Sequence, residues 1–416
     1  MPTANRAPRA CHSIAIMAIA ALLTGGAACA AGVNVTVNND AGLARPAAVV
    51  AVPFAEIAKL APDLRMYHLV VRDPKGRVLP SQVTNYKHDH HGAEYDDLVF
   101  SWNFAAGEKR AVFSVEPSAT ATPPETPCVY ARPVPERFSD MAWENDRIAH
   151  RMYGLPLNGP EAAAVGEKLR GSGVDVWGKR VRYPIIDRWY AKGHDQFHKD
   201  GEGEGLDLYS IGGSRGDGGT GIWDGQKLWT SDNFTYVRVL SNGPRRAAFS
   251  LAYSSWAAGA KGNFEELKHI TVDCGVNFDA IETSFGFIGD EALVAIGITE
   301  HPQPEGFPAA VLTRGPEDRW MSLWEENKDG GLGTAVILGP DTPPAGYVHD
   351  APENPKAYGN HLLLVKARDN QLLHYFAGAG WNRSGQFKTR ADWEAYVRAF
   401  AAAAASPLRI SVSAHP

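Results

Sequence analysis

The chain has 416 residues, with 41 basic and 47 acidic side chains and a formal net charge of −6. These charges are spread without a polybasic block, which makes nucleic acid and anionic membranes poor partners. The 42 glycines, 28 prolines and 11 tryptophans favour many turns between short strands, with some tryptophans free to line a sugar site.

The first thirty residues have the pattern of an export signal. Arg6 and Arg9 precede an apolar run from Ile14 to Leu23, and small residues follow up to Ala30. This run is too short to span a bilayer, and no later segment is apolar for long enough to do so. We therefore expect residues 1–30 to be a signal peptide cleaved after Ala30, and the mature protein to be periplasmic or secreted without membrane insertion.

Two cysteines, Cys128 and Cys274, remain after that cleavage. An oxidising compartment allows them to form one long-range disulfide, although two buried thiols fit the sequence equally well. Neither has a CxxC partner or a nearby histidine cluster, so neither is a candidate nucleophile.

Period-two alternation predicts a protein that is mainly β. Residues 31–117 are expected to form a small antiparallel β domain that contains the runs VNVTV and RAVFSV, and residues 118–135 a Pro-rich connector. Residues 136–416 hold seven further strand-like runs and predict a large antiparallel β-sandwich. Helix is scarce, and its main candidate is the segment 389–405, where Thr389 can cap the first turn.

The glycine-rich stretch GHDQFHKDGEGEGLDLYSIGGSRGDGG, residues 193–219, concentrates reactive side chains. It lacks the order of a nucleotide-binding glycine motif. An EF-hand calcium loop needs a glutamate at its twelfth position, and Ile211 occupies that position here. We interpret it as a flexible catalytic loop.

Histidine and tyrosine transfer protons, and arginine pairs with carboxylates. Together they fit β-elimination at a uronic acid. A base removes the proton beside the carboxylate, an acid protonates the departing oxygen, and a cation offsets the charge that develops. The candidates are His194 or His198 as base, Tyr209 as acid, and Arg215 or Arg147 as the carboxylate clamp.

Aromatic and polar residues near other loops are candidates for binding the sugar. Tryptophan and tyrosine faces stack on sugar rings, although most of the 11 tryptophans should belong to the core. One candidate is the tryptophan of the segment GAGW, residues 378–381, where we expect a glycine-rich turn. The predicted substrate-binding residues are Trp143, Asn145, Arg147, Tyr183, Trp189 and Trp381.

The run HDHH, His88 to His91, could offer two ligands to zinc from one side of an extended segment. It lacks a cysteine or HExxH companion, so a surface turn is the favoured interpretation. The sequence requires no cofactor, and a divalent cation remains an open option.

The segments AWENDRIAHRMYG, GSGVDVWGKRVRYPIIDRWY, HKDGEGEGLDLYSIGGSRGDGG and YFAGAGWNRSGQFKTRADWEAYV resemble the bacterial family known as domain of unknown function 4861. The resemblance covers nearly the whole mature chain. It implies an exported protein associated with pectin and ulvan degradation, similar to ulvan oligosaccharide dehydratases. The implied fold is the β-supersandwich of sugar mutarotases and several polysaccharide lyases.

The leading hypothesis is an exported enzyme that acts on uronate-containing oligosaccharides by β-elimination, as a dehydratase or a lyase. A glycoside hydrolase is the first alternative, because paired carboxylates are available among Glu202, Glu204, Asp207 and Asp217. A noncatalytic sugar-binding protein and a mutarotase-like isomerase are the others, since fold does not determine function.

Overall fold

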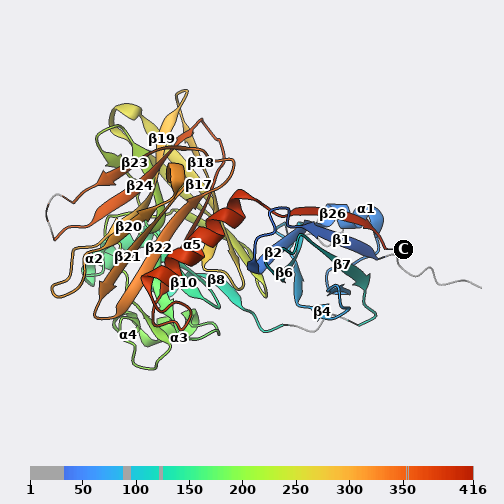
Figure 1. Cartoon of the computed structure of the whole chain (residues 1–416). Coiled ribbons are helices and arrows are strands. Elements are labelled where there is room, and N and C mark those ends of the chain that lie inside the picture. Colours follow the sequence, from blue (N-terminus) through green and yellow to red (C-terminus); the bar gives the residue numbers. More distant parts are fainter. Residues whose placement is uncertain (1–31, 88–94, 121–124, 353, 355, 416) are drawn as a thin grey trace, which may run out of the picture.

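The computed structural model describes residues 32–87, 95–120, 125–352, 354 and 356–415 (Figure 1). The predicted signal peptide, residues 1–30, and the histidine run at 88–91 lie outside these described residues. Within them, no helix combines the length and the apolar character that crossing a bilayer requires.

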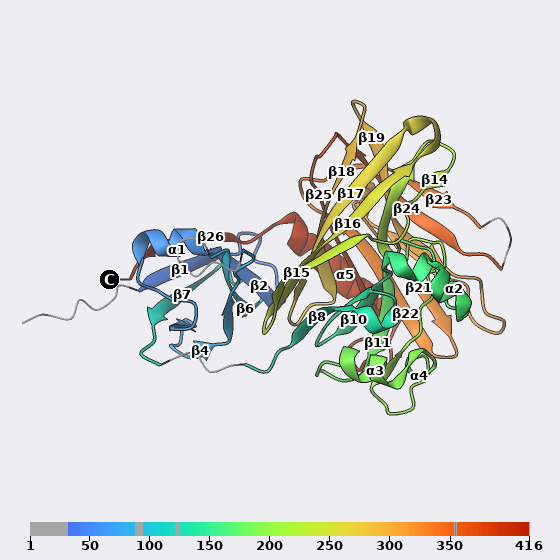
Figure 2. The ribbon, with the colours of Figure 1, turned by 180° about the vertical axis from the view of Figure 1, so that it is seen from behind.

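The chain forms a small β unit and a larger one, which lie side by side in opposite views (Figures 1 and 2). Every strand pair that we describe is antiparallel, apart from two isolated parallel bridges. The prediction of a mainly β fold with a large sandwich is confirmed.

The small unit packs two sheets around one core. Alternation decides which side chains enter it, since Val33, Val35 and Val37 are buried while the residues between them are partly exposed. One sheet has the order β26 (Arg409–Ala414), β1 (Val33–Asn38), β7 (Arg110–Pro117), β3 (Leu69–Arg72) and β4 (Val78–Leu79). The other has the order β2 (Arg45–Pro53), β6 (Asp97–Phe104) and β5 (Ser81–Val83), and helix α1 (Phe54–Leu60) follows β2.

The large unit is a sandwich in which an eight-stranded sheet faces a five-stranded one, with a continuous apolar core between them. The eight strands, in order, are β15 (Tyr236–Asn242), β16 (Arg246–Ala257), β17 (Asn263–Asp273), β18 (Phe278–Phe287), β25 (Leu373–Trp381), β22 (Gly330–Leu338), β21 (Trp320–Asn327) and β20 (Val311–Arg314). The five are β14 (Leu228–Trp229), β13 (Asp217–Trp223), β19 (Ala292–Glu300), β24 (Gly359–Ala367) and β23 (Pro344–Asp350).

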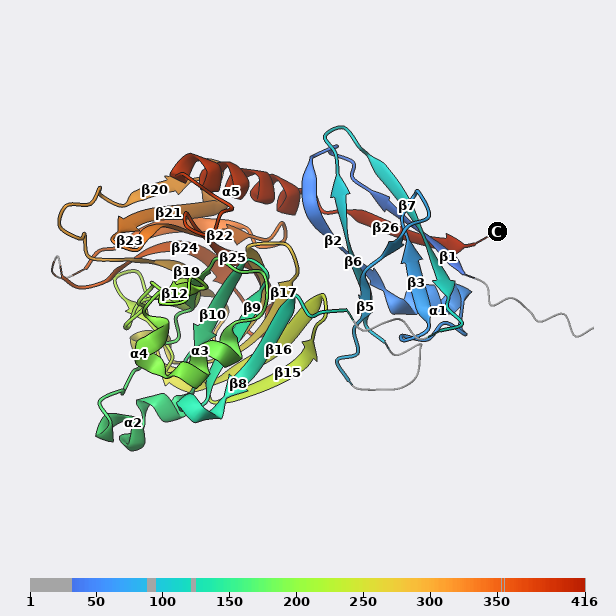
Figure 3. The same cartoon turned by 90° about the horizontal axis from the view of Figure 1, so that it is seen from below.

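A third sheet borders the sandwich and carries the glycine-rich stretch at its edge. Its order is β12 (Gly205–Asp207), β11 (Asp175–Lys179), β10 (Ile148–Met152), β9 (Asp140–Asn145) and β8 (Val129–Val134). Helices α3 (Ile186–Lys192) and α4 (His194–Phe197) cover one face of this sheet through a shared apolar cluster (Figure 3). Helix α2 (Pro160–Ala164) lies in the connection between β10 and β11.

Helix α5 (Arg390–Ala405) lies on the outer face of the eight-stranded sheet, where Trp393 and Val397 pack against the strands. Thr389 caps it as predicted, because its side chain accepts a hydrogen bond from the backbone N–H of Asp392 and Asp392 returns the bond.

Three sequence expectations need correction. The segment 129–134 of the expected connector is strand β8, since its residues pair with β9. The GAGW segment is the end of strand β25 instead of a turn. A Cβ on Gly378 would lie 2.0 Å from the carbonyl oxygen of Asn277, so this strand needs glycine for close packing. The last strand, β26, belongs to the small unit, because it pairs with β1 along its whole length.

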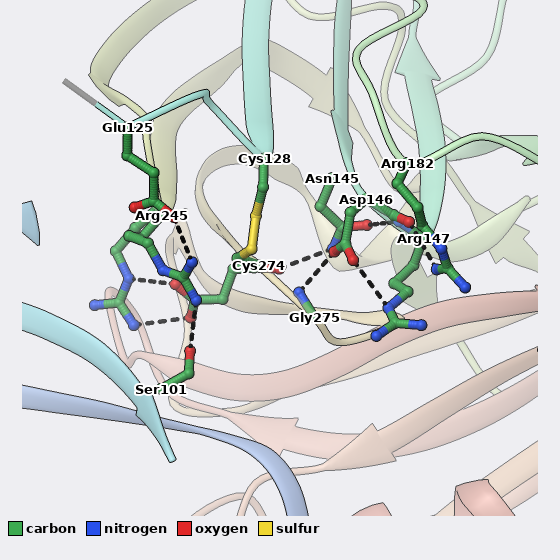
Figure 4. The surroundings of a disulfide bond; sticks show 12 residues. Ser101, Glu125, Cys128, Asn145, Asp146, Arg147, Arg182, Arg245, Cys274 and Gly275 are labelled. Carbon is green, nitrogen blue, oxygen red and sulfur yellow. Dashed lines mark hydrogen bonds and ion pairs between the residues drawn. A yellow bond between two sulfur atoms is a disulfide. The ribbon is translucent and has the colours of Figure 1, made fainter. Parts of the chain in front are cut away.

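Cys128 and Cys274 form a disulfide with Cα atoms 5.8 Å apart (Figure 4). It joins the segment before β8 to the end of β17. Beside it, Arg245 contacts Glu125 at 3.0 Å and the Ser101 hydroxyl at 3.2 Å. Because Ser101 lies in β6, these contacts tie the small unit to the sandwich.

Candidate functional site

A pocket of about 300 Å³ opens at one end of the sandwich, between the ends of β19 and β21. It concentrates side chains that can transfer protons, which come from segments far apart in the sequence. Three prolines of the segment after β19, at 302, 304 and 308, contribute to its wall. The polar and aromatic lining residues that bear on chemistry are Tyr209, Ser210, His301, Glu325 and Tyr358.

His301 sits between two hydrogen-bond acceptors. Its Nδ1 lies 2.7 Å from Oε2 of Glu325, and its Nε2 lies 2.7 Å from the carbonyl oxygen of Ser210. An imidazole that donates from both nitrogens carries a positive charge. Burial alone would lower the pKa of His301, but the Glu325 carboxylate and the Ser210 carbonyl outweigh it and hold this pKa above its usual value.

Glu325 fixes both the ring and the backbone of His301. Its second oxygen, Oε1, accepts a hydrogen bond of 2.9 Å from the backbone N–H of His301. The two residues lie on opposing sheets of the sandwich, since His301 directly follows β19 and Glu325 is in β21. The pair therefore closes the end of the core with charged groups.

Aromatic rings surround the imidazole. Tyr209 meets it edge to face at a centroid distance of 4.6 Å, and Tyr358 does so at 5.3 Å. Gly212 has a positive φ of 50°, and a Cβ there would approach the Tyr358 ring to 2.9 Å. This glycine thus serves both the turn and the packing of the pocket.

Thr299 attaches the glycine-rich segment to β19. Its hydroxyl accepts a hydrogen bond of 2.7 Å from the backbone N–H of Gly216 and lies 2.5 Å from the Ser214 hydroxyl.

Burial, reinforced by the charge of Glu325, raises the pKa of Tyr209 well above its usual value. The Tyr209 phenol therefore keeps its proton at neutral pH, as an acid requires.

The other predicted catalytic residues lie away from this pocket. His198 is partly exposed, and its Nδ1 lies 3.2 Å from the carbonyl oxygen of Asp207. The side chain of His194 falls outside what the structure describes. The expected flexible loop contains regular structure, namely α4, β12 and the start of β13.

Arg215 is fully buried and does not face a substrate. Its guanidinium donates to the Ser172 hydroxyl and to the carbonyl oxygens of Gly213 and Thr220, at 2.8–3.1 Å. The proposed role as carboxylate clamp needs correction, because this guanidinium fastens the turn between β12 and β13 from within.

Most of the predicted sugar-binding residues are also structural. Trp143, Asn145, Trp189 and Trp381 are buried, and each donates a hydrogen bond within the protein. They occur next to polar residues in the sequence, but their positions in β9, β25 and α3 place them in the interior.

Two of the predicted sugar-binding residues keep some exposure. Arg147 pairs with Asp146 at 3.3 Å. Tyr183 is the most exposed of the six, and its hydroxyl donates to Glu204 at 2.9 Å.

Three of the four carboxylates proposed for a hydrolase pair with basic side chains, and the fourth, Asp217, is buried. Glu202 and Glu204 contact Arg188 and Lys192. Asp207 pairs at 3.1 Å with the buried Arg151, which also binds Asp175. Asp217 is fully buried, and burial together with the charge of Asp279 raises its pKa well above the usual range.

Comparisons with known proteins assign the family. The family described as a domain of unknown function, DUF4861, matches residues 37–410. The chain belongs to this family. It is also 36% identical over 289 residues to "Uncharacterized protein P7" of Formosa agariphila, which covers 68% of this chain and 69% of that protein.

Solved structures similar to this DUF4861 protein share only low sequence identity with it. An alpha-mannosidase from Enterococcus faecalis V583 matches with 11% identity and a TM-score of 0.46, over 92% of this chain and 46% of its own. A glycosyl hydrolase family 38 protein from Enterococcus faecalis matches with 10% identity and a TM-score of 0.44, over 92% and 47%. The DUF4861 chain thus spans about half the length of these structures.

Sequence reasoning missed His301, Glu325 and Tyr358 in this DUF4861 protein. His301 follows an apolar strand and precedes a proline-rich segment, which is a recognisable strand-end position. Its contact with Ser210 spans 91 residues, however, and only the folded sandwich brings the two together.

Potential metal ligands occur in two groups among the described residues. Cys128, Asp146 and Cys274 form the first, but both sulfurs belong to the disulfide and offer no thiolate. Glu300, His349 and His361 form the second, next to the pocket.

Proposed function

We propose that this DUF4861 protein is a carbohydrate-active enzyme that performs β-elimination on oligosaccharides containing a uronic acid, with loss of water or of a sugar. The observation that carries the proposal is the pocket in which Tyr209, His301 and Glu325 meet. Its volume of about 300 Å³ is at the lower end for small-molecule sites, as a site for one terminal sugar unit requires.

The three side chains divide the chemistry among them. Glu325 accepts the proton from the carbon beside the substrate carboxylate, since its oxygens retain lone pairs after binding His301. Tyr209 donates its phenol proton to the departing oxygen, since the phenol is protonated at neutral pH. His301 orients Glu325 and places a positive charge where negative charge develops on the substrate.

Tyr358 completes this assignment at the mouth of the pocket. It is 37% exposed, so its ring has a face that a sugar can cover. In this proposal His198 is a positioning residue, because it contacts the backbone of Asp207, two residues before Tyr209.

The experiment is to incubate the purified protein with oligosaccharides from pectin and from ulvan. Ultraviolet absorbance of a conjugated uronate is followed, together with product masses. Elimination predicts rising absorbance, with loss of one water for a dehydratase or chain cleavage for a lyase. Shorter products without absorbance would refute elimination in favour of hydrolysis, and affinity without turnover would indicate a binding protein.

Variants test the location of the site. Tyr209→Phe should slow elimination about 10²–10⁴-fold, the usual contribution of a positioned acid. Tyr183→Phe is the matched control, because it removes an exposed tyrosine hydroxyl away from the pocket and should leave the rate nearly unchanged. If Tyr183→Phe slowed elimination more than Tyr209→Phe did, the site would instead lie on the surface around α3 and β12.

A further inference from the structure

Three neighbouring strands, β19, β24 and β23 (Figure 1), carry a histidine–carboxylate group on the sheet face that packs against the core. His361 in β24 is directly opposite Ile298 in β19 and His349 in β23. Opposite residues share one face of a sheet, and Ile298 belongs to the core between the sheets. Glu300 follows Ile298 by two residues and therefore points to the same side.

The side chains of these three residues converge. One potential ligand atom from each of Glu300, His349 and His361 lies within 4.8 Å of the others. Nε2 of His349 is 2.6 Å from Oε2 of Glu300, and the two imidazole rings stack at 4.6 Å between centroids. Two imidazoles and one carboxylate are a ligand set that binds zinc-class cations and leaves a coordination position open.

The surroundings hold the ligands as metal sites usually do. The hydroxyl of Tyr347 lies 2.8 Å from Nδ1 of His361, which fixes that ring and leaves its second nitrogen for a cation. The Arg314 guanidinium lies 4.0 Å from the centroid of the Tyr347 ring and orders this partner in turn. Outer-sphere contacts of this kind orient a ligand before the metal arrives.

The proposed ligands differ in how far they are exposed to solvent. His361 is only 6% exposed, whereas the His349 side chain is 42% exposed and gives a cation a path from solvent. An ordinary surface pair has no such buried third partner. His374, for example, contacts Asp341 and Glu282 while all three side chains are at least one-third exposed.

We propose that Glu300, His349 and His361 form a binding site for one divalent cation of the zinc class. The proposal is independent of the elimination chemistry, since cation binding can be measured without a substrate. A bound cation would sit beside His301, which follows Glu300 directly and lines the pocket.

The experiment uses the full mature protein without an affinity tag, stripped of metal by a chelator that is then removed. Zn²⁺ is titrated by calorimetry, and bound metal is counted by mass spectrometry after desalting. Co²⁺ provides a second readout, because its visible absorption reports coordination by protein ligands. The variants are His349→Ala and Glu300→Gln, which change partly exposed side chains and should leave the fold intact.

Two controls separate this site from other histidines. His374→Ala removes a histidine that also pairs with carboxylates, and it should bind Zn²⁺ as the wild type does. A variant with His88, His90 and His91 replaced by Ala tests the histidine run outside the described residues.

The expected result is one equivalent of Zn²⁺ per chain, with affinity at least tenfold weaker in His349→Ala and Glu300→Gln and unchanged in both controls. Equal binding in His349→Ala, loss of binding in either control, or no binding at micromolar Zn²⁺ would each overturn the proposal.

Discussion

The buried ion network around Arg151 provides the sharpest test of what holds the glycine-rich segment in place. The Arg151 side chain is 3% exposed and donates to Oδ2 of Asp175 at 2.5 and 3.0 Å and to Oδ2 of Asp207 at 3.1 Å. Its guanidinium also lies over the rings of Tyr153, Trp177 and Phe197, at 5.2–5.7 Å from their centroids. Two fully buried carboxylates thus depend on one cation.

Arg151→Met should lower the free energy of unfolding by about 3–5 kcal/mol, the usual cost of leaving buried charges without their partner. The assay is denaturant unfolding followed by the fluorescence of the 11 tryptophans, one of which, Trp177, contacts Arg151. Arg151→Lys should lose less stability, because lysine keeps the positive charge although it lacks the planar guanidinium that binds both carboxylates. Lys366→Met is the control, since the exposed Lys366–Glu291 pair contributes only about 0–1 kcal/mol.

The loss should also depend on pH, with a definite sign. Burial raises the pKa of Asp175 and Asp207, which Arg151 opposes. Without Arg151 the folded-state pKa values of both carboxyl groups rise further above their unfolded-state values. The stability of the variant is then retained below the unfolded-state pKa and is lost as pH rises toward the folded-state pKa. Arg151→Met should therefore be less destabilising at pH 5 than at pH 8. A loss no larger than that of Lys366→Met, or one independent of pH, would refute this reasoning.

Three further predictions concern stability. Replacing Cys128 and Cys274 by Ser together should cost about 2–4 kcal/mol in denaturant unfolding, because the disulfide closes a loop of 146 residues; an unchanged midpoint would contradict this. Burial raises the pKa of Asp140 to about 7, although the charges of Arg151 and Arg137 act in the opposite direction. The contribution of Asp140 to stability therefore falls as pH rises from about 4 to 7, and the stability of Asp140→Asn should increase relative to wild type over that range. Parallel pH profiles of the two proteins would contradict this prediction. Gly378→Ala should lower the free energy of unfolding by about 1–3 kcal/mol or more in thermal melts, because its Cβ would meet Asn277. Gly201→Ala is the control and should be nearly neutral, because the space around Gly201 is open.

The sequence predicts the fold class well because most strands alternate. VNVTV becomes β1 with a strictly alternating burial pattern, and the Thr389 cap marks the start of α5. Strands that need glycine were missed or misread, as β25 shows. At Gly378 and Gly380 glycine admits neighbouring backbone and aromatic atoms, which is a property of the packed partner and not of the local pattern.

The candidate site was only partly predictable. Tyr209 was identified from its neighbourhood in the sequence, and it does line the pocket. His301 and Glu325 are isolated polar residues at strand ends, and their partnership arises only when two sheets face each other. Arg215 was misjudged because a glycine-rich neighbourhood suggests exposure, while tight turns around it place the guanidinium inside the protein.

Strand β26 has a consequence for the order of assembly. Strands β1 to β7 of the small unit precede the sandwich in the chain, yet the sheet edge at β1 stays unpaired until β26 has been synthesised. Its edge is therefore open to wrong partners while the rest of the chain is synthesised. The sandwich and α5 can form before this closure, so the small unit is completed only after the sandwich that separates its strands along the chain.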